Sequence, residues 1–381
     1  MPQNHQPGGR ADKSDPLLLT PGPLTTSLSV KEAMLHDFGS RDTGFIELNR
    51  RMLQRLVDII HGQDSHVAVP LQGSGTFVVE AMIGNFVPPD GKVLICINGA
   101  YGQRIAKIAR YYGRDSVLLE NQENEPTDTN ELERLLRNDT DITHVAVVFT
   151  ETTSGIINPL DKIADIVATA GKGLLIDAMS CFGALPIDAR VLKFDAVCAS
   201  SNKCLEGAPG MGFCLARKAA LLETEGNSPS LSLDLYDQWQ SMEKNHQWRF
   251  TPPTHVILAF SQALNEFEAE GGVVGRGDRY RNNCRLLIDG MRKMGFSPLL
   301  SDELQAPIIV TFRMPEDSQF DFEKFYDALR DRGYVIYPGK LTVADSFRVG
   351  CIGHVFENDI RLALDAIHDV LREMEVSLPV T

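Results

Sequence analysis

A chain of 381 residues, 43% of them hydrophobic, can bury a large core, and we expect one large domain and one smaller domain. The formal net charge of −14 disfavours nucleic acid as a partner, and the absence of an apolar run of roughly 18 residues disfavours a membrane span. The seven scattered cysteines include no CxxC pair, which indicates reduced thiols in a cytoplasmic protein rather than a disulfide framework.

The chain opens on a polar stretch, residues 1–15, that we expect to be a disordered tail. A helix is predicted over residues 45–60, where apolar residues recur at the helical spacing. From His66 onward, short apolar runs alternate with helical stretches; the runs are VAVPLQ, VLICIN, HVAVVFT, GLLIDAM, FDAVCAS and GMGFCLAR. This alternation predicts an α/β fold with a mostly parallel sheet flanked by helices, in which ligands bind beyond the carboxyl ends of the strands.

The alternation breaks between residues 221 and 250, and helices are predicted again over 255–271 and 279–295. The remainder is predicted to contain strands PIIVTF, YVIYPG and FRVGCIG and helices FEKFYDALRDRG and DIRLALDAIHDVLREM. We expect this part to be a smaller C-terminal α/β domain. The predicted division is therefore a large domain over 16–274 and a small domain over 275–381.

Two polar clusters follow predicted strands. In QGSGT, Ser74, Gly75 and Thr76 stand between a strand and a helix, where backbone N–H groups and hydroxyls suit a phosphate, although such residues also cap helices that bind nothing. Asp177 ends the run GLLID, and a buried carboxylate at that place needs a cation or a hydrogen-bond donor unless it caps the next turn.

A third cluster contains Lys203, in SSNKCLEGAPG near the end of a predicted strand. Solitary lysines are usually solvated, but a partly desolvated lysine can act as a Schiff-base nucleophile. Together the three clusters offer a phosphate cradle, a carboxylate for a protonated ring nitrogen and an amine for an aldehyde. Those are the requirements of pyridoxal 5'-phosphate.

The same motifs resemble a known family. QGSGT, ETTSG, LLIDAMSCFGALPID and SSNKCLEGAPGMGF follow one another as in the class V, fold-type I aminotransferases. Within that family, RFTPPTH, DELQAPIIVTF, YVIYPGK and FRVGCIG are similar to the 2-aminoethylphosphonate–pyruvate aminotransferases, and the likeness covers about residues 17–371. The resemblance implies a homodimeric pyridoxal-phosphate enzyme that moves the amino group of 2-aminoethylphosphonate to pyruvate, giving phosphonoacetaldehyde and L-alanine.

Roles for individual residues are also implied by the resemblance. Lys203 would bind the cofactor's aldehyde and later carry a proton, and Asp177 would keep the pyridine nitrogen protonated. Thr152, with Thr153 as the second candidate, would form a hydrogen bond to the cofactor near its phenolic oxygen. Tyr101 would stack over the ring unless it is simply an aromatic residue at the start of a helix. The phosphate would be held by Ser74, Gly75 and Thr76, by Asn202 or Ser200, and by Thr251 of the partner subunit.

Arg348, in FRVG, has the best-defined substrate role in this comparison. An arginine near the end of an apolar strand needs an anion, and its planar guanidinium suits a carboxylate or a phosphonate. A structural ion pair is the alternative. One arginine could bind the phosphonate of the amino donor and then the carboxylate of the keto acceptor.

Several alternatives stay open. The stretch DFGSRDTGF departs somewhat from the phosphonate enzymes, so alanine–glyoxylate or serine–glyoxylate transamination is a neighbouring hypothesis. A lyase of the same fold, such as a cysteine desulfurase, would need a mobile cysteine, and a phosphate-binding protein without catalysis would leave Lys203 structural. No HExxH or paired histidine spacing occurs, so we expect no metal site.

Overall fold

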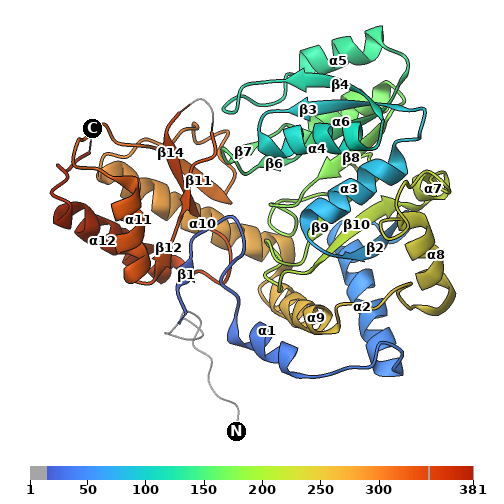
Figure 1. Ribbon diagram of the computed structural model, residues 1–381, viewed down its shortest axis with the longest axis horizontal. Helices are drawn as coiled ribbons and strands as arrows, with labels where there is room; N and C mark the ends of the chain where they lie inside the picture. The colour runs from blue at the N-terminus through green and yellow to red at the C-terminus, as the bar shows by residue number, and fades with distance from the viewer. Residues whose placement is uncertain (1–14, 342–343, 381) are drawn as a thin grey trace.

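The computed structural model describes residues 15–341 and 344–380, so the tail predicted over 1–15 lies outside the described residues except for Asp15. Its largest sheet has seven strands in the order β2-β10-β9-β8-β5-β3-β4 (Figure 1). The bounds are β2 His66–Gln72, β3 Lys92–Ile97, β4 Asp115–Glu120, β5 Ile142–Val148, β8 Gly173–Asp177, β9 Ala196–Ser200 and β10 Met211–Arg217. Only β10 runs antiparallel to its neighbours, so the predicted mostly parallel sheet is confirmed.

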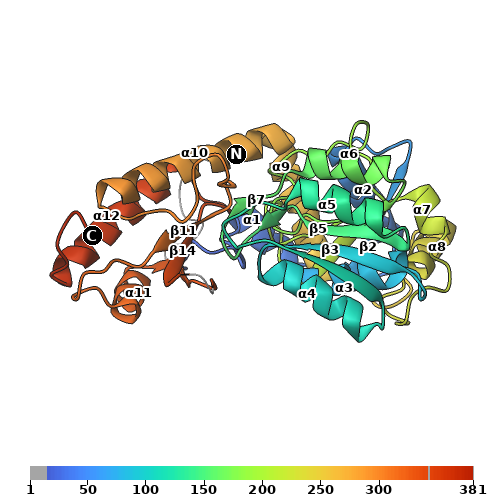
Figure 2. The same cartoon turned by 90° about the horizontal axis from the view of Figure 1, so that it is seen from above.

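Helices cover both faces of this sheet (Figure 2). Side chains along each strand alternate between the two faces, so Leu174 and Ile176 join one hydrophobic cluster while Leu175 joins another. The first face is covered by α2 Thr43–Ile59, α5 Thr129–Asn138, α6 Leu160–Thr169 and α9 Thr254–Ala269. The second face is covered by α3 Gly75–Phe86, α4 Ala100–Tyr111, α7 Lys218–Leu222 and α8 Leu235–Asn245.

The C-terminal part is built on a small antiparallel sheet in the order β11-β14-β13. Its elements are α10 Gly272–Lys293, β11 Ile309–Arg313, α11 Phe322–Asp331, β12 Tyr334–Val335, β13 Tyr337–Pro338, β14 Ser346–Gly350 and α12 Glu357–Glu373. The long helix α10 joins this part to the large sheet, because Tyr280 packs in the core of the large sheet and Leu287 packs in the C-terminal core (Figure 2). The predicted smaller α/β unit is present in this region.

The first described strand lies with the C-terminal part of the chain. β1 (Leu17–Leu18) pairs in parallel with β12, and the Leu17 and Leu19 N–H groups donate to the carbonyls of Gly333 and Val335. The run YVIYPG, predicted as one strand, is therefore divided between two sheets, since β12 pairs with β1 while β13 pairs with β14.

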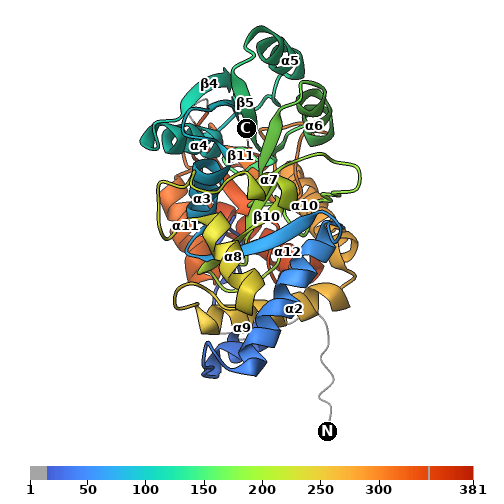
Figure 3. The same ribbon diagram turned by 90° about the vertical axis from the view of Figure 1, so that its right-hand side faces the viewer.

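Short elements complete the described chain. They are α1 Leu28–Glu32, the 3-10 helix η1 Ala33–Leu35, and the hairpin of β6 Thr150–Glu151 and β7 Ile156–Ile157. At one edge of the large sheet, β2 packs beside α2 and α8 (Figure 3). A helix long and apolar enough to cross a bilayer is not found between residues 15 and 341 or between 344 and 380.

Candidate active site

The site lies at the carboxyl ends of the central strands. Asp177 is the last residue of β8, and Lys203 follows the end of the neighbouring parallel strand β9 by three residues. The two side chains are near enough for the negative charge of Asp177 to raise the pKa of Lys203. The structure therefore brings the predicted carboxylate and the predicted amine together at the edge where such sheets bind ligands.

The Lys203 amine is held in a partly desolvated place. Its Nζ donates to the Pro21 carbonyl at 2.7 Å, and burial lowers the pKa of Lys203 to about 8. Gly22 has a φ of +128°, and a Cβ atom there would lie 2.2 Å from Nζ, so the turn closes over the amine only because this residue is glycine. A lysine in this setting is a stronger nucleophile near neutral pH than an exposed one.

Asp177 is buried at the end of β8. Burial raises its pKa to about 6, while the Met179 N–H bond to Oδ1 (2.9 Å) and the charges of Arg104 and Lys203 act in the opposite direction. The Asp177 carboxylate therefore caps the following turn, which was the alternative considered from the sequence. It also lies near two cations, Arg104 and Lys203. It is mostly ionised at neutral pH and can therefore stabilise a protonated nitrogen beside it.

Unused donors gather where the phosphate cradle was predicted. Ser74 occupies the N-cap of α3 but makes no capping hydrogen bond with its side chain, so its hydroxyl is not consumed by the helix. Gly75 and Thr76 begin the first turn, and their N–H groups have no partner within the helix; the Phe77 N–H donates to the Ser74 carbonyl at 3.0 Å. The hydroxyl of Ser200, at the end of β9, is buried without a hydrogen-bond partner in the described part of the chain.

Tyr101 lies in the first turn of α4, where a buried carboxylate fixes the backbone. Glu151 Oε2 accepts the Tyr101 N–H at 3.0 Å and lies near the Gly102 N–H, while Glu151 Oε1 accepts from the Thr153 hydroxyl. Burial raises the pKa of Glu151 above its usual value, and these hydrogen bonds offset only part of that rise. Thr153 is thus committed to Glu151, whereas Thr152 contributes its carbonyl to Arg348.

Arg348 reaches the site from β14 of the small sheet. Its side chain is 1% exposed, its Nε donates to the Pro338 carbonyl at 3.1 Å and its Nη1 to the Thr152 carbonyl at 2.9 Å. Burial lowers its pKa, and its charge in turn lowers the pKa of Lys203. Over residues 15–341 and 344–380 it forms no ion pair, so the structural ion pair considered from the sequence lacks its carboxylate.

Two further predicted residues show no contact that assigns them a role. Asn202 is half-buried beside Lys203, and Thr251 is exposed shortly before α9. The contact expected from Thr251 requires a partner subunit, so it stays a prediction.

Two residues of this site were not singled out from the sequence, Arg104 and Glu151. Glu151 stands directly after an apolar run, in the quoted motif ETTSG, and a charged residue at that place was a usable signal. Arg104 lies one helical turn after Tyr101, and that spacing alone would have placed it on the same side of α4.

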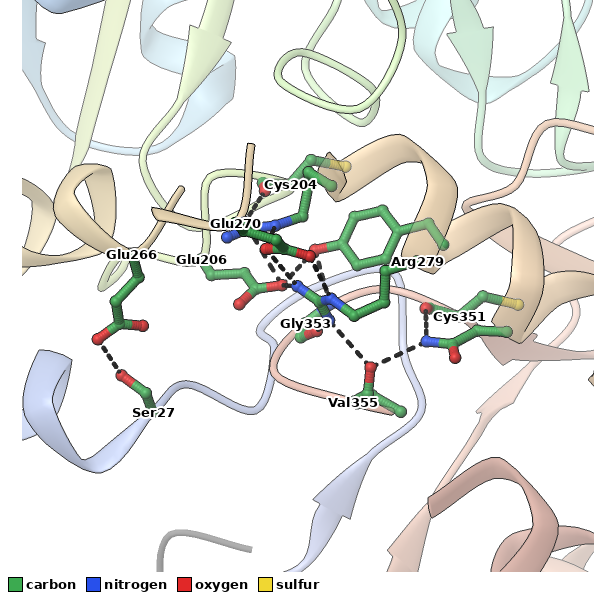
Figure 4. Close-up of polar contacts among 12 residues, drawn as sticks. Ser27, Cys204, Glu206, Glu266, Glu270, Arg279, Cys351, Gly353 and Val355 are labelled. Atoms are coloured by element: carbon green, nitrogen blue, oxygen red, sulfur yellow. Dashed lines mark hydrogen bonds and ion pairs between the residues drawn. The ribbon is translucent and has the colours of Figure 1, made fainter. Parts of the chain in front are cut away.

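A buried ionic network holds the turn that follows Lys203 (Figure 4). The Glu206 N–H donates to the Lys203 carbonyl at 2.8 Å, and the Glu206 carboxylate accepts from Arg279 and from the Tyr280 hydroxyl. Burial alone would raise the pKa of Glu206, but Arg276 and Arg279 outweigh it and the pKa is lowered. Arg279 also donates to the Gly353 and Val355 carbonyls, so α10 connects the Lys203 turn to the loop after β14.

Breaking this network is expected to destabilise the protein. Replacing Glu206 with glutamine removes the most deeply buried carboxylate of the network, while Glu270 still pairs with both Arg276 and Arg279. We therefore expect a loss of about 1.5–3 kcal/mol in the free energy of unfolding, measured by chemical denaturation. Asp278→Asn, which removes an exposed ion pair with Arg281 on the same helix, serves as the control and leaves stability nearly unchanged. Equal effects of the two substitutions would contradict the expectation.

Known proteins match this chain over almost its whole length. The family model of class-V aminotransferases matches residues 26–343. The chain is a class-V aminotransferase. It is 54% identical to 2-aminoethylphosphonate–pyruvate transaminase 1 of Cupriavidus pinatubonensis over 96% of this chain and 97% of that protein. It is also 54% identical to 2-aminoethylphosphonate–pyruvate transaminase of Pseudomonas fluorescens over 95% of this chain and 98% of that protein.

The fold of the aminotransferase is likewise that of solved relatives. The crystal structure of pyridoxamine–pyruvate aminotransferase from Mesorhizobium loti superposes with a TM-score of 0.88 at 24% identity, covering 96% of this chain and 94% of that chain. The predicted fold type I is confirmed. The family uses pyridoxal phosphate, and the residues present suit that cofactor, because the uncommitted Ser74 hydroxyl, the orphaned Ser200 hydroxyl, Asp177 and Lys203 supply the donor set it requires.

The lowered pKa of Lys203 predicts how cofactor uptake by the aminotransferase depends on pH. Only the neutral amine attacks an aldehyde, so the rate at which apoprotein captures pyridoxal phosphate should rise with pH and level off above about pH 8. Stopped-flow absorbance measures this rate, with free Nα-acetyllysine, whose rate climbs until about pH 10.4, as the control.

Asp177→Asn should move that inflection to lower pH, because the negative charge of Asp177 raises the pKa of Lys203. A protein profile that follows the free lysine would contradict the lowered pKa.

Proposed function

We propose that this aminotransferase moves the amino group of 2-aminoethylphosphonate to pyruvate, giving phosphonoacetaldehyde and L-alanine. The proposal is supported by the two phosphonate transaminases, which are 54% identical to the chain over nearly their full lengths. We further propose a cytoplasmic homodimer in which each chain divides into a large cofactor-binding domain, 16–274, and a small domain, 275–381.

Arg348 is the observation that carries the substrate assignment. A buried guanidinium is costly unless an anion pairs with it. In the described chain Arg348 donates hydrogen bonds only to carbonyl oxygens; its guanidinium carbon lies 6.0 Å from the centre of the Tyr337 ring, and Glu151 acts on its charge without forming an ion pair. Those two hydrogen bonds use Nε and one N–H of Nη1, so the remaining N–H groups of its five can receive a bidentate anion. Phosphonate on the donor and carboxylate on pyruvate are both such anions, which lets one residue serve both half-reactions.

The remaining residues are proposed to divide the work as follows. Pyridoxal phosphate supplies, when bound, an aldehyde that takes up amines and a ring that withdraws electrons. Lys203 Nζ would bind the aldehyde carbon at rest and, once free, would carry a proton from the substrate carbon to the cofactor carbon. Asp177 would keep the ring nitrogen protonated, Thr152 would form a hydrogen bond to the cofactor near its phenolic oxygen, and Tyr101 would stack on the ring. The phosphate would be bound by Ser74, Gly75, Thr76, Ser200, Asn202 and Thr251 of the partner subunit.

A donor screen tests the proposal. Purified holoenzyme given 2-aminoethylphosphonate and pyruvate should form alanine, and the visible band of the cofactor should change when the donor alone is added. The same assay with alanine or serine as donor and glyoxylate as acceptor tests the neighbouring transaminations. If either of those pairs reacts and the phosphonate amine yields no alanine, the substrate assignment is wrong while the family stands.

The desulfurase alternative receives no support from the structure. A cysteine desulfurase needs a mobile cysteine that can reach its substrate, and all seven cysteines of this chain are buried and unpaired. Burial also raises the pKa of Cys204, next to Lys203, well above its usual value, so this thiol is a poor nucleophile.

A further inference from the structure

A second arginine, Arg104 on α4, belongs to the site. Its Nη1 donates to the Thr76 hydroxyl oxygen at 3.0 Å, and its guanidinium carbon lies 4.7 Å from the centre of the Tyr101 ring. Between residues 15 and 341 and between 344 and 380, no carboxylate forms an ion pair with it. Its charge acts on Asp177 and Lys203, lowering the pKa of both.

The direction of the hydrogen bond to Thr76 matters. A threonine hydroxyl has one proton to donate and lone pairs that accept. Because Arg104 can only donate, Thr76 Oγ1 is the acceptor in this contact, and its own proton remains free for another acceptor. A cation behind the hydroxyl polarises the O–H bond and makes it a better donor to an anion.

The Thr76 hydroxyl, with its free proton, lies in the first turn of α3. In that turn the Gly75 and Thr76 N–H groups have no partner within the helix, and the Ser74 hydroxyl makes no capping bond, whereas the Phe77 N–H donates to the Ser74 carbonyl. Backbone donors, two hydroxyls and the positive end of the helix dipole thus share one place, with Arg104 adding a full charge behind them.

We propose that Arg104 is a positioning residue for the phosphate group of the cofactor, acting through the hydroxyl of Thr76. This inference rests on the phosphate placement at Ser74–Thr76 given under the proposed function, and it is independent of the amino donor. Arg104 fixes which way the Thr76 hydroxyl points and strengthens it as a donor to a dianion.

The test compares two ligands that differ only in the phosphate. Apoprotein of the wild type and of Arg104→Gln is titrated with pyridoxal phosphate and with pyridoxal, and the dissociation constants are read from the visible absorbance. Since a charge-assisted hydrogen bond is lost, we expect affinity for pyridoxal phosphate to fall about tenfold while affinity for pyridoxal changes less than about twofold. Arg104→Lys, which keeps the charge, should recover part of the preference for the phosphorylated ligand.

Controls separate this role from a structural one. Arg110→Gln makes the same change at an exposed position of the same helix and should alter neither constant. Thr76→Val should reduce the preference for pyridoxal phosphate, and adding Arg104→Gln to it should reduce the preference little further. Far-ultraviolet circular dichroism confirms that each variant is folded.

Three results would overturn the inference. An equal loss of affinity for both ligands in Arg104→Gln would make the residue structural. Full additivity of the two substitutions would show that Arg104 does not act through Thr76. A normal preference in Thr76→Val would show that the phosphate binds elsewhere, which removes the phosphate placement itself while leaving the proposed amino donor untouched.

Discussion

Replacing Lys203 with alanine is expected to lower the rate of alanine formation more than about a thousandfold, because the same amine would both hold the cofactor and transfer the proton. The visible band of the bound cofactor should shift, and borohydride should no longer fix the cofactor to the chain. A far-ultraviolet circular dichroism spectrum like that of the wild type would show that the variant is folded, so that both changes report the lost covalent bond to Nζ. Added methylamine should restore a small part of the activity by replacing the missing base.

Lys193→Ala is the matched control for this experiment. Lys193 is exposed shortly before β9, on the same polypeptide segment that leads to the site, so its removal should change neither activity nor colour. Retained activity in Lys203→Ala, together with borohydride labelling at another lysine, would refute the assignment of the amine.

Arg348→Gln is expected to impair both half-reactions. Removing one member of a buried charge pair costs about 2–5 kcal/mol, so kcat/KM for 2-aminoethylphosphonate and for pyruvate should each fall at least about thirtyfold. Arg348→Lys should also be impaired, since an ammonium cannot make the two parallel hydrogen bonds of a guanidinium. Single-turnover absorbance changes of the cofactor measure each half-reaction by itself.

A donor without an anionic group makes the Arg348 experiment specific. Ethylamine lacks the phosphonate, so wild type and Arg348→Gln should process it at similar, slow rates. Arg313→Gln, an exposed arginine at the end of the adjacent strand β11, is the control for loss of charge from the small sheet. A large loss with ethylamine, or an effect on only one of the two natural half-reactions, would contradict a shared anion site.

Much of the fold was predictable because buried parallel strands appear as apolar runs in the sequence. β4 was not predicted, because it is an edge strand whose side chains are mostly exposed, and its apolar run, VLL, is only three residues long. α8 was missed although Leu235, Trp239 and Met242 recur at the helical spacing and Asp234 caps the helix, so the signal was available. The pairing of β1 with β12 joins two very short strands from opposite ends of the chain, and no local pattern encodes it.

The site was predictable to the extent that strand ends determine it. Asp177 and Lys203 follow neighbouring parallel strands, so their approach followed from the fold class alone. The contacts of Arg104 with Thr76 and of Arg348 with Thr152 depend on how α4 and the small sheet pack against the large one. Side-chain packing of that kind is a tertiary property, which is why the partners of Arg348 were not predicted although the residue was singled out from its strand end and from the family resemblance, and why Arg104 was not singled out at all.

The short segment from Leu17 to Gly22 performs two tasks. Its first part completes a strand pair with β12, and its last part supplies the carbonyl that accepts from Lys203 Nζ. A truncation past this point would therefore remove a piece of the C-terminal scaffold and the resting partner of the reactive amine in one cut. Anyone trimming the protein for crystallisation should leave the chain intact from Leu17 onward.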